Sequence, residues 1–259
     1  MKVPHRVYGQ TLFDFLSRGS ETSLPVKDEI QGTFRRAELW LAPAYFTVYW
    51  IYLFFHQESE FWHWLSLVLI PFLLAVGLRA GRPSILSESL ASFGLRRGNL
   101  TRGMGVTLLL GVAVGFVQVF LSRSGPEVID IFQSGRAVFL FPLTFLLLLG
   151  LTGFTEEFFF RGFLQTRLEA LFSSRWIGLA VSTLLFGLYH VPYAYFNPNW
   201  PSAGNWGEAF STGMVEGIFG GVVLGGLYLY TRGNLLVCIV LHALVDTFPG
   251  MALIKFGGS

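Results

Sequence analysis

The sequence contains few charged residues and almost no cysteine, and both shortages narrow the class of protein. Only 13% of its 259 residues are Asp, Glu, Lys or Arg, against about 25% in soluble domains, and 53% are hydrophobic. Such a composition is typical of a membrane protein. The single cysteine, Cys238, has no second cysteine to pair with, so an intramolecular disulfide is excluded.

The chain also lacks the concentrated positive charge of nucleic-acid-binding proteins. Its formal net charge is +2 and its basic residues lie in loops, so we expect no nucleic-acid partner. Residues 1–38 contain no continuous apolar stretch and do not resemble a cleavable signal peptide. We expect them to form a cytoplasmic N-terminal segment, followed by a single integral membrane domain over residues 39–259.

Long apolar segments predict the fold class. A helix needs about 20 residues to cross the hydrocarbon core of a bilayer. The fold is therefore expected to be all-α, a polytopic transmembrane helix bundle with about seven membrane helices, in a range of six to eight. The predicted spans lie near residues 39–55, 61–78, 104–121, 137–158, 176–196, 214–231 and 234–254.

The placement of lysine and arginine predicts the orientation. With the N-terminus in the cytoplasm, 15 of the 18 basic residues fall in cytoplasmic segments and only 3 fall outside. Basic residues are retained on the cytoplasmic side of membranes, so this split favours a cytoplasmic N-terminus. We expect an integral protein of a lipid bilayer, the cytoplasmic membrane of a bacterium.

Glycines are spaced regularly in the predicted span at 214–231. Gly217, Gly221 and Gly225 are separated by four residues and therefore lie along one face of a helix. Small residues on one face allow two helix backbones to approach closely in lipid. We expect this face to serve tight helix packing rather than a functional site.

Several ionisable residues interrupt the apolar segments: the adjacent Glu156 and Glu157, then His190, His242 and Asp246. Such a side chain costs at least a few kcal/mol in a membrane helix unless it has a partner or lines a cavity. One histidine alone is more often a helix-bridging residue. Several such groups on three predicted helices are hard to explain by packing, so we treat them as candidate site residues.

Helical spacing separates the two glutamates. Glu157 and Arg161 are four residues apart and can form an ion pair, whereas Glu156 faces another direction and is free for chemistry. His242 and Asp246 are also four residues apart and share a face.

The number of helical residues between each group and the nearest turn predicts how deep in the membrane the group lies. If the chain turns at Ser173 and Ser174, Glu156 and His190 stand at the same depth and can meet. Outside this set, we expect His56 and His63 at the membrane interface and Glu216 in contact with water.

The chemistry of these residue types is that of hydrolysis. A glutamate can act as the general base that activates water, while histidines assist and stabilise a developing oxyanion. No serine or cysteine is placed beside a histidine as a nucleophile, so attack by water is favoured over an acyl-enzyme. The carboxylates and imidazoles of Glu156, His190, His242 and Asp246 would also suit zinc, although the sequence contains no HExxH motif.

Three short motifs occur in order within residues 150–250. EEFFFR at 156–161 matches EExxxR, FGLYH at 186–190 matches FxxxH, and HALVD at 242–246 is similar to HxxxN. Together they resemble the CAAX protease and bacteriocin-processing (CPBP or Abi) family of intramembrane proteases, which includes the type II CAAX prenyl endopeptidases. The resemblance implies a metal-free glutamate site, no cofactor, and a membrane-associated protein or peptide as substrate.

The resemblance also implies a role for each residue. Glu156 would activate water, Glu157 would be held by Arg161, and His190 would assist the water. His242 and position 246 would stabilise the oxyanion. Asp246 departs from the pattern, since those enzymes carry asparagine there. An ionised aspartate cannot donate to an oxyanion, so Asp246 must be protonated, orient His242 or bind a positive group.

Two alternatives remain beside this interpretation. One is a zinc-dependent membrane protease with the same fold. The other is a non-enzymatic bacteriocin-immunity or scaffold protein; a transporter with a proton-relay carboxylate is less favoured. Replacement of Glu156 separates them, because an immunity scaffold should tolerate it. The sequence leaves the substrate open among prenylated C-termini, bacteriocin leaders and C-terminal sorting tails.

Overall fold

A computed structural model describes residues 34, 36–55, 60–79, 85–95, 100–122, 124–198 and 200–254. Residues 1–33 of the predicted cytoplasmic segment and His56 lie outside this part of the chain. Where the structure describes the chain, it forms helices and no strands. The α-helices are α3 (Arg36–Leu53), α4 (Glu60–Trp64), α5 (Ile70–Leu78), α6 (Ile85–Ser92), α7 (Leu100–Leu121), α8 (Gly125–Gln133), α9 (Ala137–Leu148), α10 (Phe154–Glu157), α11 (Thr166–Leu171), α12 (Arg175–Phe196), α13 (Trp206–Tyr230) and α14 (Leu235–Leu253). Three π-helical segments join some of them: η1 (Leu65–Leu69), η2 (Leu149–Gly153) and η3 (Phe158–Gln165).

Six helical stretches of the described chain are long and apolar enough to cross a membrane, which confirms an all-α polytopic bundle. The first predicted span, 39–55, corresponds to α3, which is not one of the six. Its 18 residues would suffice in length, but Arg36, Glu38 and three tyrosines lower its hydropathy. The six stretches are Phe61–Leu78, Gly103–Leu121, Ala137–Leu171, Arg175–Phe196, Trp206–Tyr230 and Leu235–Leu253.

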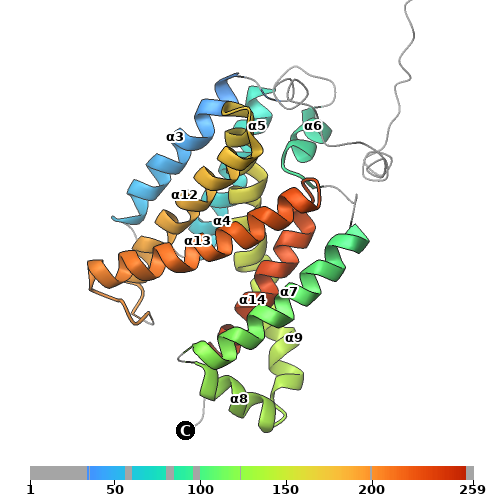
Figure 1. The fold of residues 1–259 in the computed structure, drawn as a ribbon. Coiled ribbons are helices and arrows are strands. Elements are labelled where there is room, and N and C mark those ends of the chain that lie inside the picture. The colour runs from blue at the N-terminus through green and yellow to red at the C-terminus, as the bar shows by residue number, and fades with distance from the viewer. Residues whose placement is uncertain are drawn as a thin grey trace, which may run out of the picture.

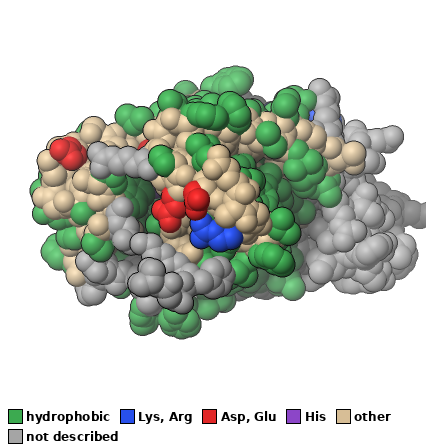
Figure 2. Space-filling model, turned by 90° about the horizontal axis from the view of Figure 1, so that it is seen from below, with side chains coloured by type: hydrophobic (Ala, Val, Ile, Leu, Met, Phe, Trp, Pro, Cys, Tyr) green, Lys and Arg blue, Asp and Glu red, His purple; other side chains and the backbone are tan. Residues whose placement is uncertain are grey.

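The helices pack in pairs around the long central helix Ala137–Leu171 (Figure 1). Helix α12 packs along α13, while α14 packs against α7 and α9. Large apolar side chains remain exposed on the outside, among them Leu109 and Phe139, at 71% and 78% exposure. Seen from below, hydrophobic side chains lie mainly around the rim, and a small group of acidic and basic side chains lies near the middle (Figure 2). Such a surface suits contact with lipid tails.

The segments expected on the cytoplasmic side meet at one end of the bundle. Glu38 at the start of α3 accepts a hydrogen bond from Arg79 at 2.9 Å and lies 3.4 Å from Arg167 of α11. All three side chains are buried. Nearby, the backbone N–H of Leu235 donates to Gly94 at 3.0 Å, which brings the start of α14 to the end of α6. The predicted orientation, with the N-terminus and these segments all in the cytoplasm, requires that they lie at the same end of the bundle.

The glycine face of α13 packs directly on α12. A Cβ added at Gly217 would lie 2.4 Å from the Cα of Gly187, and one at Gly213 would lie 2.9 Å from the backbone of Val191. Real Cβ atoms do not approach backbone that closely, so only glycine permits this separation of the two helices. The predicted packing role of the glycines is confirmed. It also holds α12, which carries His190, close to α13.

The predicted turn between the two motif-bearing helices is present. Helix α11 ends at Leu171 and α12 begins at Arg175. Ser173 adopts a positive φ of 51°, and the Ser174 hydroxyl accepts a hydrogen bond from Ile177 N–H as an N-cap. The chain therefore reverses where the sequence indicated, and α12 runs back past α10.

Candidate active site

Glu157 is the fixed member of the glutamate pair. Its side chain is fully buried in α10, and its Oε1 accepts a hydrogen bond from Arg161 Nη1 at 2.8 Å. The Arg161 guanidinium in turn lies over the Phe186 ring, with Cζ 4.3 Å from the ring centroid. An ion pair and a cation–π contact thus tie the first motif to the second, on α12.

His242 is bound to the same carboxylate oxygen. Its Nδ1 lies 2.7 Å from Glu157 Oε1, and because a carboxylate only accepts, Nδ1 carries the donated proton. The spacing of Glu157 and Arg161 gave no sign of this bond, because it joins α10 to α14. Glu157 therefore has two functions in the geometry: it neutralises Arg161 and it sets the plane of the His242 ring.

The other nitrogen of His242 faces two carboxylates. Its Nε2 lies 3.3 Å from Asp246 Oδ2, one turn further along α14, and 3.8 Å from Glu156 Oε2. The side chains of Glu156 and His242 are about one-tenth exposed, whereas that of Asp246 is 36% exposed. Asp246 thus lies at the open edge of the group, with Glu156 behind it.

Glu156 has one occupied and one open carboxylate oxygen. Its Oε1 accepts a hydrogen bond from the Tyr189 hydroxyl at 3.4 Å. Its Oε2 is buried and has no hydrogen-bond partner among the described residues. The 3.8 Å separation from His242 Nε2 is too long for a direct hydrogen bond, so a small molecule beside both atoms could bind to each.

His190 is bound within its own helix. Its Nδ1 donates to the Phe186 carbonyl at 2.8 Å, one turn back on α12, which leaves Nε2 as the ring nitrogen that can contact another group. Both His190 and His242 lie edge-on to the Phe186 ring. Within the described chain no hydrogen bond or ion pair links His190 to Glu156 or His242. The structure therefore brings Glu156, Glu157, His242 and Asp246 together and leaves His190 beside them.

The group does not form a preorganised metal site. Within the described residues, no three or more His, Cys, Asp or Glu side chains are arranged to hold a metal ion. The His242 Nδ1 and one oxygen of Glu157 are already bound to each other. Histidines that bind zinc through Nε2 commonly donate Nδ1–H to a carboxylate in this way, so the zinc alternative on Glu156, His190, His242 and Asp246 stays a prediction.

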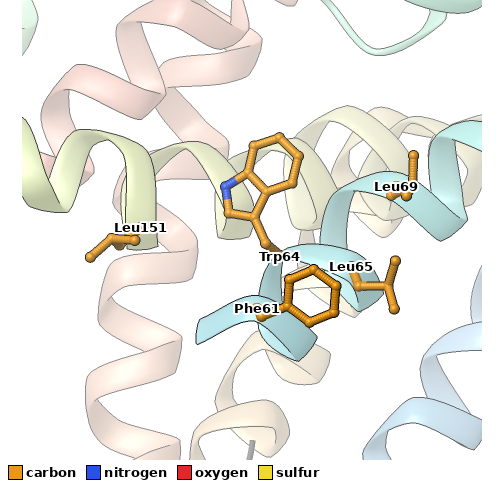
Figure 3. A pocket seen from close by; sticks show the side chains of 5 residues that line it. All are labelled: Phe61, Trp64, Leu65, Leu69 and Leu151. Atoms are coloured by element: carbon orange, nitrogen blue, oxygen red, sulfur yellow. The ribbon is translucent and has the colours of Figure 1, made fainter. Parts of the chain in front are cut away.

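An apolar pocket lies between the α4–η1 segment and η2, and none of the candidate site residues lines it (Figure 3). It has a volume of about 350 Å³ and is lined by Phe61, Trp64, Leu65, Leu69 and Leu151. The Trp64 indole donates to the Gly150 carbonyl at 3.3 Å, which holds this wall against η2. Its five lining side chains are all apolar or aromatic, and none of them is ionisable.

A comparison with known protein families gives one match. Residues 138–248 match the model of a family described as type II CAAX prenyl endopeptidase Rce1-like. This segment is similar to that family. It includes all three motifs, so the resemblance predicted over 150–250 is confirmed, and the Rce1-like match indicates a protease of the membrane. Neither curated proteins nor solved structures gave a match to the chain.

One expectation from the sequence is wrong. His63, predicted at the membrane interface, is buried at 8% exposure and contacts Tyr193 and Thr155 through its two ring nitrogens. The flanking tryptophans, Trp62 and Trp64, are indeed exposed, and they suggested an interfacial position for the residue between them. Because successive residues of a helix point about 100° apart, His63 points into the protein while its two neighbours point outward. The sign of this in the sequence was that His63 is an ionisable residue within a run of exposed aromatic residues.

Proposed function

We propose that this protein is an intramembrane endopeptidase in which Glu156 activates water to hydrolyse a peptide bond of a membrane-associated protein or peptide. One observation carries the proposal: Glu156 Oε2 is buried, without a hydrogen-bond partner in the described chain, and 3.8 Å from His242 Nε2. A carboxylate oxygen held open in an apolar site is suited to take a proton from water. The Rce1-like match agrees with a peptide hydrolase.

The proposed reaction uses the two glutamates differently. Water gives a proton to Glu156 as its oxygen bonds to the carbonyl carbon, and the carbonyl oxygen becomes an oxyanion. The C–N bond then breaks, and the leaving amine takes the proton from Glu156. Glu157 stays bound to Arg161 and His242 throughout, so it positions the site but exchanges no proton with the substrate.

The oxyanion would be stabilised from α14. His242 donates through Nδ1 to Glu157, so a proton on Nε2 would let it donate to the oxyanion at the same time. Asp246 Oδ2 lies 3.3 Å from that Nε2 and can orient the ring, or donate directly when protonated. His190, with Nε2 free to accept, would assist the attacking water from α12.

The substrate and setting are part of the proposal. The chain would lie in the cytoplasmic membrane of a bacterium with its N-terminus inside, and would act without a cofactor. A prenylated C-terminus, a bacteriocin leader or a sorting tail could each reach the site as a membrane-associated peptide. The zinc-dependent protease and the immunity or scaffold protein are the competing functions.

The deciding experiment compares membrane proteomes of strains that carry wild type, Glu156→Gln or a matched control, Glu208→Gln. Glu208 is exposed in the first turn of α13 and takes no part in the site. We expect one membrane-associated protein to keep an unprocessed terminus only in the Glu156→Gln strain. Purified Glu156→Gln protein should turn over substrate about 10²-fold or more slowly than wild type, which is roughly the rate enhancement that a general base contributes. More than about a tenth of wild-type turnover would exclude Glu156 as the base.

A further inference from the structure

A second buried polar group adjoins the site on the side away from His242. Its centre is His63 of α4, on a helix that carries none of the three motifs. His63 Nδ1 lies 3.3 Å from the Tyr193 hydroxyl, and Nε2 lies 3.3 Å from the hydroxyl of Thr155. Thr155 immediately precedes Glu156. A buried histidine with both nitrogens in polar contact is an organised feature rather than a packing residue.

This group continues to Glu156 through two tyrosines on α12. Tyr193 and Tyr189 are one turn apart on α12, and their ring centroids are 5.0 Å apart, so the two rings pack against each other. The Tyr189 hydroxyl then donates to Glu156 Oε1 at 3.4 Å. This distance is long for an O–H···O bond, as hydrogen bonds at catalytic groups often are before substrate binds.

Packing leaves Tyr189 little freedom. Its side chain is 1% exposed, and its ring lies 5.0 Å from Phe160 and 6.4 Å from Tyr49. A buried phenol needs a partner for its hydroxyl, and Glu156 supplies it. The Tyr189 hydroxyl contacts Oε1 of Glu156, and the other oxygen, Oε2, lies on the side of His242, 3.8 Å from its Nε2.

We propose that Tyr189 is a positioning residue that holds Glu156 in its reactive orientation, and that His63, through Tyr193, orients the Tyr189 hydroxyl. The inference rests on the proposed role of Glu156 as base and deepens it. It extends the working site to the helix that begins with α4, which neither the three motifs nor the family match at 138–248 includes.

The His63 contacts are polar on both sides of the ring. The Thr155 hydroxyl donates to the Leu151 carbonyl, so it accepts from Nε2 of His63. Nδ1 of His63 and the Tyr193 hydroxyl, 3.3 Å apart, form the contact on the other side of the ring. Asparagine at position 63 would place an amide, which can donate or accept, near Nδ1, whereas leucine has the bulk without a polar group. The two substitutions therefore separate the polar contact from packing.

The contact itself is tested without any substrate, by thermal unfolding of the purified full-length protein. Tyr189→Phe should lower the melting temperature in wild type but not in Glu156→Met, where no carboxylate accepts the bond. Such coupling between the two positions is the signature of a direct interaction. Equal shifts in both backgrounds would overturn the inference. Tyr195→Phe is the control, since its ring stacks on Trp206 and its hydroxyl has no hydrogen bond in the described chain.

The positioning role is tested by kinetics in proteoliposomes, with an internally quenched peptide that carries a farnesylated C-terminal cysteine motif as the probe. Tyr189→Phe should lower kcat about ten-fold at unchanged KM, on the scale of a hydrogen bond to a charged group. His63→Leu should also lower kcat, His63→Asn should recover most of it, and His63→Leu should have no further effect in the Tyr189→Phe background. Independent, additive losses would reduce His63 to a structural residue.

These outcomes are distinguishable from failure of the proposed function. Activity in Glu156→Gln would exclude the glutamate base, whatever Tyr189 does. An inactive Glu156→Gln together with wild-type kcat in Tyr189→Phe would overturn only the positioning role. If the probe is not cleaved by wild type, the unfolding measurements still decide whether Tyr189 holds Glu156.

Discussion

His242 Nδ1 lies 2.7 Å from Glu157 Oε1, so the second glutamate of the first motif holds the histidine of the third. The same oxygen accepts from Arg161 at 2.8 Å. One buried carboxylate thereby determines the position of groups on two helices. Glu156, its neighbour, stays free of both donors because it lies about 100° around the helix.

Substitution of Glu157 or Arg161 should therefore affect stability as well as activity. Arg161→Ala leaves a buried carboxylate without its cation and should destabilise the protein by about 3 kcal/mol or more. Glu157→Gln should lower both stability and turnover, since His242 loses the carboxylate that orients it. Thermal unfolding and membrane accumulation measure the first effect. Wild-type stability in both variants would contradict the structural role of the pair.

Asp246 is expected to tolerate asparagine but not alanine. An amide can still accept from His242 through its oxygen or donate through its NH₂, whereas alanine can do neither. Asp246→Asn should keep substantial activity, and Asp246→Ala should lose about 10²-fold or more, the usual scale for an oxyanion donor. Initial rates on the same probe give the ranking. Wild-type turnover in Asp246→Ala would make position 246 a packing residue.

Chelation should leave the enzyme fully active, because the proposed mechanism needs no metal. Prolonged treatment with a permeant chelator, followed by activity and metal measurements on the purified protein, tests this. Loss of activity that zinc restores would favour the metalloprotease, with His190 and His242 as the expected nitrogen ligands.

Gly217 should be the most sensitive glycine of α13. A Cβ at this position would lie 2.4 Å from the Gly187 backbone, so Gly217→Ala must separate α12 from α13 and should cost about 1–3 kcal/mol. Gly226→Ala, on the same helix with nothing within 4 Å of the added Cβ, is the matched control. It should be neutral or stabilising because alanine favours helix. Equal melting temperatures would argue against close contact.

Sequence patterns predicted the depth of the site groups better than their direction. Segment length and the turn at Ser173 and Ser174 placed Glu156 level with His190, but in the described chain Glu156 contacts Tyr189, the residue before it, and His190 bonds to Phe186 instead. The bond from His242 to Glu157 depends on how far α14 is rotated toward α10, which local spacing does not specify. His63 was misplaced for the same reason, since exposed neighbours hid which way its own side chain turns.

The buried Arg167 has a consequence for how this protein can be assembled. Its guanidinium is fully buried and 3.4 Å from Glu38, which belongs to the first described helix of the chain. The protease-like segment 138–248 therefore takes the counter-ion of one of its buried cations from a helix that lies a hundred residues earlier in the chain. Expressed alone, that segment would bury Arg167 without this carboxylate, so we expect it to be less stable than a chain that includes α3.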